Sequence, residues 1–184
     1  MRVQARYARA SVRALWVLVS CLVAACVQAE PATEYQVKAA FLYNFAKFVE
    51  WPPASFAGPA GPLEICVLGQ DPFGEELRSI TQDKLVNGHR LEVRHVDDAQ
   101  QARSCHILFV ASSEKGQLKL ILESLHGSSV LTVGDSKGFT EHGGMINFVL
   151  EDDRVKFDVN RKAAEEAGLK ISSKLLSVAK AVSA

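Results

Sequence analysis

Three short apolar runs, separated by segments with a helical pattern, constrain the fold of this chain more than any other feature of its sequence. They are Leu63–Gly69, Ser104–Ala111 and Val130–Gly134, and each is too apolar to leave one face in water. Strands buried on both faces are typical of a parallel sheet that helices cover. The sequence therefore predicts the α/β class: a single compact three-layer α/β/α domain with a mostly parallel sheet.

The segments around these runs carry the signals of helices and of one hairpin. Thr33 is expected to cap a helix that continues to about Glu50, and Asp71 to cap one that begins at Pro72. An antiparallel hairpin is expected at one edge of the sheet. Its strands would be 145–150 and 155–159, with further helices over 113–125, 160–168 and 172–182 and a half-exposed strand over 91–96.

Residues 1–29 have the parts of a secretory signal, which indicates export from the cytoplasm. Four arginines precede an apolar run over 14–27, which is short for a membrane span. Small residues favour cleavage before Glu30, and we expect one domain over 30–184. Two alternatives stay open: an uncleaved anchor helix, and a lipid on Cys26, which ends a lipobox-like Val-Ala-Ala-Cys.

The charge of the exported part argues against nucleic acid as a partner. The full chain carries 21 basic and 21 acidic side chains, and loss of the four arginines of residues 1–29 leaves 17 basic ones, a formal charge of −4. Nucleic-acid binders normally present a basic field. We therefore expect a partner of another class.

The sequence predicts no catalytic residue, no metal and no cofactor, and therefore a protein that is not an enzyme. Ser112 and Lys115 have the Ser-x-x-Lys spacing of acyl-serine enzymes, but the companion motifs of that class are missing from the sequence. The five histidines are scattered, and His106 lies in a buried run, where a core residue is expected rather than a ligand. The glycine fingerprints of nucleotide sites do not occur either.

Two cysteines, Cys66 and Cys105, lie in the globular part of the chain, each in an apolar run. In an oxidising compartment two such cysteines most often form one disulfide, and two buried free thiols are the alternative. A bond between them would close a loop of about 40 residues and stabilise the fold by about 4 kcal/mol.

Two local features suggest a surface that contacts a partner. Trp51, followed by two prolines, presents an aromatic ring on a stiff backbone, although it also fits a helix stop that packs on the core. Phe139, Gly143 and Gly144 lie at the entry to the hairpin, where glycines allow the close approach of another surface or form a tight turn. We expect Trp51 and the 139–144 loop to contact a partner.

Seven motifs in order resemble the YfiR family. They are EYQVKAAFLYNFAKFVEWP at 34–52, ICVLG at 65–69 with DPFG at 71–74, CHILF at 105–109, LTV at 131–133, GGMI at 143–146, FDVN at 157–160 and LKISSKLL at 169–176. The resemblance covers nearly all of residues 34–180, and several separate motifs in order make it specific.

Resemblance to this family implies a periplasmic, non-catalytic regulator with a compact α/β fold, often a homodimer. The best-understood relatives bind the periplasmic sensor domain of an inner-membrane diguanylate cyclase and repress the cyclase. An OmpA-like outer-membrane lipoprotein can sequester the repressor, which raises cyclic di-GMP and favours biofilm. The family's disulfide carries over to Cys66 and Cys105, whereas the second cysteine pair of some members has no counterpart here.

The leading hypothesis from the sequence is thus a periplasmic repressor that acts by protein–protein contact. The alternative is a sensor module that binds a small ligand without a cyclase partner. Its site would lie at the carboxyl ends of the parallel strands, where open α/β sheets usually bind ligands.

Overall fold

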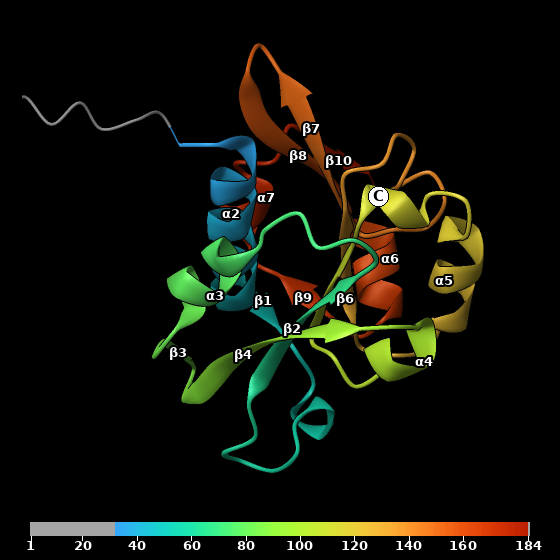
Figure 1. Ribbon diagram of the computed structural model, residues 1–184. Coiled ribbons are helices and arrows are strands. Elements are labelled where there is room, and N and C mark those ends of the chain that lie inside the picture. Colours follow the sequence, from blue (N-terminus) through green and yellow to red (C-terminus); the bar gives the residue numbers. More distant parts are fainter. Residues whose placement is uncertain (1–31, 184) are drawn as a thin grey trace, which may run out of the picture. The chain divides into compact units, whose positions relative to one another are not determined.

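The computed structural model describes residues 32–183, which form an α/β fold (Figure 1). The helices are α2 Glu34–Phe48, α3 Glu75–Thr81, α4 Ala99–Ala102, α5 Leu118–Ser124, α6 Arg161–Glu166 and α7 Ser173–Leu176. The strands are β1 Val49–Glu50, β2 Leu63–Leu68, β3 Leu85–Val86, β4 His89–Val96, β5 Ile107–Val110, β6 Leu131–Gly134, β7 Ile146–Glu151, β8 Arg154–Asn160, β9 Lys170–Ile171 and β10 Ala181–Ser183.

Eight of these strands form one sheet in the order β10-β8-β7-β6-β5-β2-β4-β3, and β1 pairs separately with β9. The predicted α/β class, with a mostly parallel sheet and an antiparallel hairpin, is confirmed. The three apolar runs of the sequence supply β2, β5 and β6, which lie side by side and are buried on both faces.

The chain reverses its direction of winding beside β2. β2 pairs in parallel with β4 on one side and with β5 on the other, so that Ile65 lies opposite both Val93 and Ile107. The chain first crosses from β2 to β4 and then returns past β2 to β5. Because of this reversal, α3 packs on one face of the sheet, whereas α4 and α5 pack on the other.

The hairpin of β7 and β8 forms as predicted and projects from the rest of the fold (Figure 1). Asp152 and Asp153 make its turn, with φ values of 52° and 56° that aspartate tolerates better than most residues. The strand β10 then adds in parallel to the outer side of β8, with Val182 opposite Val159. The sheet therefore extends one strand beyond the hairpin.

Two hydrophobic clusters lie on the two faces of the sheet. The larger cluster has 25 buried residues, includes Phe45, Phe148 and Phe157, and packs under α2, α3 and α7. The smaller cluster packs under α4 and α5. It consists of Cys66, Leu68, Val96, Ala102, Cys105, Leu108, Val110, Leu118, Ile121, Leu125, Val130 and Phe139.

The helix after β2 begins later than the sequence predicts. Asp71 does not cap it, because Asp71 Oδ1 accepts a hydrogen bond from the backbone N–H of Phe73 at 2.8 Å and closes a local turn. Gly74 follows with a φ of 55°, and α3 starts only at Glu75. The Asp71 side chain thus stabilises a turn instead of capping the helix.

The predicted C-terminal helix is also too long. Ser172 caps it as expected, with its side chain accepting from the N–H of Leu175, but the helix ends at Leu176 rather than near 182. Lys180 then donates its backbone N–H to the carbonyl of Phe157 at 2.8 Å, which starts the pairing of β10 with β8. Hydrogen bonds offered by an open strand therefore override local helix propensity.

The predicted signal over 1–29, cleavage before Glu30 and the lipid on Cys26 lie outside the described residues and stay predictions. Thr33 lies within them, and it caps α2 through a capping box with Gln36, as the sequence predicts for this helix start. In the part of the chain that the structure describes, no helix combines the length and apolarity needed to span a bilayer.

Candidate functional site

Cys66 and Cys105 form a disulfide, so the alternative of two free thiols does not hold in this structure. Cys66 lies in β2 and Cys105 two residues before β5, and the bond joins these neighbouring strands with Cα atoms 6.1 Å apart. Both side chains are buried in the smaller cluster. The bond spans a sequence separation of 39, which on the chain-entropy model stabilises the fold by about 4 kcal/mol.

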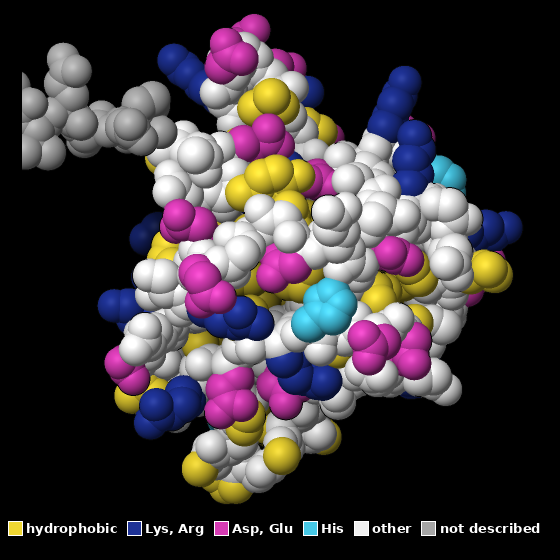
Figure 2. All heavy atoms as spheres, viewed as in Figure 1, with side chains coloured by type: hydrophobic (Ala, Val, Ile, Leu, Met, Phe, Trp, Pro, Cys, Tyr) yellow, Lys and Arg dark blue, Asp and Glu magenta, His cyan; other side chains and the backbone are white. Residues whose placement is uncertain are grey.

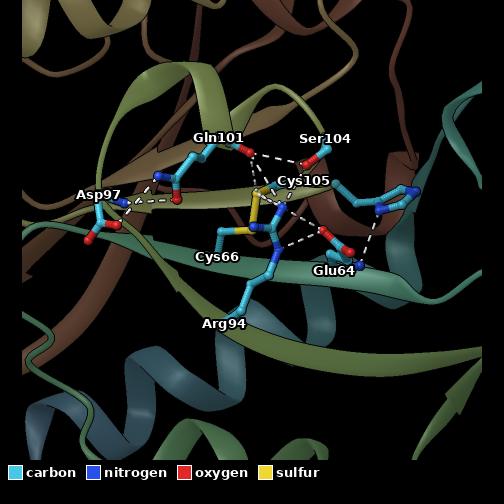
Figure 3. Close-up of polar contacts among 8 residues, drawn as sticks. Glu64, Cys66, Arg94, Asp97, Gln101, Ser104 and Cys105 are labelled. Atoms are coloured by element: carbon cyan, nitrogen blue, oxygen red, sulfur yellow. Dashed lines mark hydrogen bonds and ion pairs between the residues drawn. A yellow bond between two sulfur atoms is a disulfide. The ribbon is translucent and has the colours of Figure 1, made fainter.

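Arg94 lies against this disulfide, as Figure 3 shows. The register of the sheet places Arg94 opposite Cys66. Its guanidinium donates to Glu64 Oε2 at 2.9 Å, to Ser104 Oγ at 2.6 Å and to Cys105 Sγ at 3.5 Å. Side chains from β2, β4 and the segment before β5 thus converge on one half-exposed cation. A half-exposed ion pair contributes up to about 1 kcal/mol, so the main effect of Arg94 is to fix the side chains around the disulfide.

Glu64 and the two cysteines bring three potential metal-ligating atoms within 4.8 Å of one another. Their chemistry does not fit a metal in the oxidised protein. Sulfur in a disulfide is not a thiolate, and the Glu64 carboxylate already pairs with Arg94 Nη2 at 2.8 Å. The arrangement therefore cross-links the sheet instead of offering a metal site.

Trp51, which the sequence predicts to contact a partner, is half-buried and follows β1 directly. Its indole N–H donates to the backbone carbonyl of His106 at 3.0 Å, and its ring meets the His106 imidazole edge-on. The chain then leaves the sheet over residues 52–61 and returns to it at Leu63 (Figure 1). Trp51 thus fixes one end of this projecting loop to the amino ends of the parallel strands.

Phe56 stacks between two imidazole rings at the base of this loop. Its ring centroid lies 3.8 Å from that of His89 and 4.3 Å from that of His106. The buried His106 accepts a hydrogen bond at Nδ1 from the backbone N–H of Glu64 at 3.1 Å. Burial lowers the pKa of His106 below its ordinary value, and the charge of Glu64 opposes this shift.

A hollow of about 530 Å³ opens beside Trp51. Apolar side chains make up most of its walls, with Glu50, Asn87 and His89 as the polar exceptions. In Figure 2, hydrophobic side chains gather at the lower end of the molecule, where Figure 1 shows the 52–61 loop. The apolar residues involved are Val49, Trp51, Pro53, Phe56, Pro59, Leu63 and Val86 in the hollow, and the exposed Ala54, Ala57 and Ala60 in the loop.

Phe139, the second aromatic residue predicted to contact a partner, has a fully buried side chain. Its ring lies between Gly134 and Gly144, where an added Cβ would come within 2.4 Å and 2.2 Å of ring carbons. Both glycines are therefore required by the close approach of this ring. Phe139 supports the 139–144 loop from below, and the exposed residues of that loop are Glu141, His142 and Gly143.

The structure does not bring the two predicted contact features together in one hollow. Gly143 is exposed and lines a separate hollow of about 340 Å³, together with His126, His142 and Lys162. Trp51 lines the hollow at the amino ends of the parallel strands. That Trp51, Phe139, Gly143 and Gly144 belong to a partner-binding surface stays a prediction.

The protein's own side chains fill the space between the carboxyl ends of β2 and β5, one part of the edge where the alternative hypothesis places a small ligand. At the carboxyl ends of β2 and β5, Ser113 Oγ accepts from the N–H of Gln70 at 3.0 Å and donates to the Glu114 carboxylate at 3.1 Å. An added Cβ on Gly69 would lie 2.4 Å from Ser113 Oγ. A hollow of about 400 Å³ remains at the same edge, with Leu68 at the end of β2, Asp97 after β4 and Glu114 after β5 in its lining. The small-ligand alternative therefore stays a prediction.

Lys38 forms a buried ion pair with Asp135 at the carboxyl end of β6. Its Nζ lies 2.7 Å from Asp135 Oδ2 and 2.5 Å from Glu34 Oε1. Burial by itself lowers the pKa of Lys38, but the hydrogen bonds to Asp135 and Glu34 outweigh it and hold this pKa above its ordinary value. Lys38 therefore stays charged at neutral pH, and its contact with Asp135 fixes α2 to the sheet.

Sequence reasoning missed Arg94, Glu64, Phe56 and His89. Arg94 and Glu64 carry a usable signal, because each is a charged residue inside a strand-like run. Their meeting at the disulfide depends on the register between β2 and β4, which no local pattern encodes. Phe56 lies in a segment rich in glycine, proline and alanine, and only the return of the loop places it between two histidines.

The fold and this site define a disulfide-bonded α/β domain whose surface carries an aromatic hollow and a projecting loop. The model of the YfiR/HmsC-like family matches residues 35–180. This match covers most of the chain, so the protein belongs to the YfiR/HmsC-like family, as the resemblance of its motifs implied. The family is periplasmic and regulatory rather than catalytic, and membership supports a periplasmic regulatory role in the context of cyclic di-GMP.

Comparison with solved structures gives two further similarities. A conserved domain protein from Vibrio cholerae is similar over 82% of this chain and 60% of that chain, with a TM-score of 0.55 and 10% identity. The chain thus spans about 60% of that structure, and the likeness shows the fold alone. The ABC domain from Streptococcus pneumonia in complex with L-Trp is similar over 65% of this chain and 55% of that one, with a TM-score of 0.47 and 14% identity. No curated protein matches the chain.

Proposed function

We propose that this protein represses an inner-membrane diguanylate cyclase by binding the periplasmic sensor domain of that cyclase. The observation that carries the proposal is the match of residues 35–180 to the YfiR/HmsC-like family. A disulfide between Cys66 and Cys105 fits a compartment that is oxidising.

The hollow beside Trp51 and the 52–61 loop are the surface that we propose for this contact. Interface cores are enriched in aromatic residues and depleted of charge, and the hollow has this composition. Trp51 is half-buried with its N–H fixed to the sheet, so little side-chain freedom would be lost on binding.

Repression requires that the repressor bind the inactive state of the cyclase more tightly than the active state. A ligand with equal affinity for both states shifts nothing, however tightly it binds. To move the cyclase from one state to the other almost completely, the preference must reach about 10⁴-fold. An OmpA-like outer-membrane lipoprotein would relieve repression by competing for the repressor, and the repressor itself would act as a homodimer.

The test compares a strain that lacks this protein with strains that carry variants of it. Deletion should raise cyclic di-GMP, and the wild-type protein should restore the lower level. Pro59→Arg adds a charge at the rim of the hollow and should lower affinity for the co-purifying cyclase about tenfold, as for an interface contact. The matched control is Leu120→Arg on α5, another exposed apolar residue, which does not line this hollow.

Unchanged cyclic di-GMP after deletion contradicts repression of a cyclase. Restoration of the lower level by both variants alike places the contact elsewhere and leaves repression intact. The two results separate the function from the surface.

A further inference from the structure

The 52–61 loop is attached to the sheet mainly through the stack of Phe56 between two histidines. Among the described residues, the backbone hydrogen bonds donated by Ser55, Phe56, Gly58 and Gly61 all close within the loop or at its first residue. The contact from the sheet to the far end of the loop is that of His89 Nδ1 with the carbonyl of Gly61, at 2.7 Å. The position of the loop therefore depends on aromatic stacking more than on backbone pairing.

His106 is held in one neutral form by this environment. Its Nδ1 accepts from the N–H of Glu64, so this nitrogen carries no proton and the ring proton lies on Nε2. The Nε2 atom is buried and has no hydrogen-bond partner among the described residues. Only 3% of His106 is exposed, with Trp51 against one edge and Phe56 over its face.

Protonation of His106 would break one of these contacts and place a charge in the stack. A proton on Nδ1 would face the N–H of Glu64 and break the hydrogen bond between them. The new charge would lie in an apolar stack, where burial without a matched partner is costly. Water would relieve that cost only by reaching the ring, and the side of the ring that can open is the one covered by Phe56 and its loop.

We propose that the His89–Phe56–His106 stack is an acid-sensitive latch, which holds the 52–61 loop on the sheet at neutral pH and releases it when His106 is protonated. Release moves one wall of the hollow, because Phe56 and Pro59 line it from the loop side. The latch thus couples acidity to the shape of the surface beside Trp51, whichever molecule binds there.

The charged groups that face His106 set the direction of this effect. Glu64 of β2 favours the protonated ring, but its carboxylate is already paired with Arg94 of β4. His89 of β4 opposes a positive charge on His106. Burial, the largest influence, also favours the neutral ring and lowers the pKa of His106. The folded state therefore binds this proton less readily than the open loop, and the stabilisation from the latch is lost as pH falls from about 6.5 through the folded pKa.

Trp51 reports on the latch directly. The chain has two tryptophans, Trp16 and Trp51, so Trp16→Phe leaves a single fluorophore at the base of the loop. In this background, the full protein should show an acid-induced shift of Trp51 emission to longer wavelength. The ratio of open to closed loop should rise by up to about tenfold per pH unit, as for one linked proton. Far-UV circular dichroism should stay constant over the same range.

Three variants decide the assignment. His106→Asn keeps an acceptor for the Glu64 N–H without a titrating ring and should abolish the acid shift. His95→Asn, at an exposed histidine of the same strand as His89, should leave it unchanged. Phe56→Leu should give the acid-like emission already at neutral pH. An acid shift that survives in His106→Asn, or that coincides with loss of circular dichroism, overturns the latch.

Discussion

The two faces of the sheet are stabilised by different means. The larger cluster holds 25 buried residues and several aromatic rings in mutual contact, such as Phe45 with Phe157 at 5.2 Å. Lys38 of α2, the helix that packs on this face, forms the buried ion pair with Asp135. The smaller cluster holds 12 buried residues and a single aromatic ring, that of Phe139, and it carries the disulfide.

This difference indicates why the covalent bond lies where it does. Apolar burial stabilises a cluster roughly in proportion to the area removed from water, so the smaller cluster contributes less. A cross-link adds stability without further apolar area, because it restricts the unfolded chain. The face with the larger cluster thus depends on packing and a buried charge pair, whereas the face with the smaller cluster depends on the disulfide and on the close fit of the Phe139 ring.

The largest loss should come from breaking the ion pair on the larger face. Lys38→Met leaves the Asp135 carboxylate buried without its partner, and loss of one member of such a pair costs about 3–5 kcal/mol. Urea unfolding at pH 7 measures this. Lys47→Met, an exposed lysine of the same helix, is the control and should be nearly neutral. Equal free energies of unfolding for the two variants would show that the ion pair does not stabilise this face.

Removal of the disulfide tests the smaller face. Cys66→Ala with Cys105→Ala should lower the free energy of unfolding by about 2–4 kcal/mol, mainly by freeing the unfolded chain. The wild-type protein with its disulfide reduced should lose a similar amount. If the double variant unfolds at the same urea concentration as the wild type, the smaller cluster is stable by packing alone and does not depend on the disulfide.

Gly144→Ala tests the fit of Phe139 in the smaller cluster. The new methyl group would lie 2.2 Å from two ring carbons and 2.8 Å from the carbonyl oxygen of Phe139, so the ring must shift, at a cost of about 1–3 kcal/mol. Gly116→Ala is the matched control, because its Cβ would meet open space. Thermal unfolding of both variants should show a lower midpoint for Gly144→Ala only; equal midpoints would show that the ring adapts freely.

Arg94→Ala should have the smallest effect. Its pair with Glu64 is half-exposed, and such pairs contribute up to about 1 kcal/mol. Arg90→Ala, on the same strand and 64% exposed, serves as the control and should change nothing measurable. A loss for Arg94→Ala well above that range in urea unfolding would mean that the guanidinium is part of what holds the smaller face together.

Local signals made the best part of the fold predictable from the sequence. Thr33 and Gln36 form a capping box, and α2 begins where this motif places it. The three apolar runs predicted the parallel strands at the centre of the sheet, because strands covered on both faces are typically this uniformly apolar. The disulfide was predictable from two lone cysteines in a chain that we expect to be exported. Its neighbour Arg94 was not predictable, because strand register decides that contact.

Two helix bounds were predicted wrongly because other hydrogen-bond partners competed for the groups at the expected helix ends. Asp71 found a partner two residues away, and the segment near Ala181 found an open strand. At the candidate site, the contact of Phe139 with a partner stays a prediction, and the structure adds that Gly134 and Gly144 make room for the ring of Phe139 itself. A sequence pattern shows that a close approach is needed without showing which side chain approaches.

The pairing of β1 with β9 has a consequence for how the chain reaches its native state. It joins Val49 to Ile171, so it must wait until nearly the whole polypeptide is available and a very long loop has closed. Such distant contacts form late, since the entropy of closure must be overcome before the contact stabilises anything. The segment that carries Trp51 should therefore become ordered in the slowest phase of refolding, and a nascent chain has no finished surface there to offer.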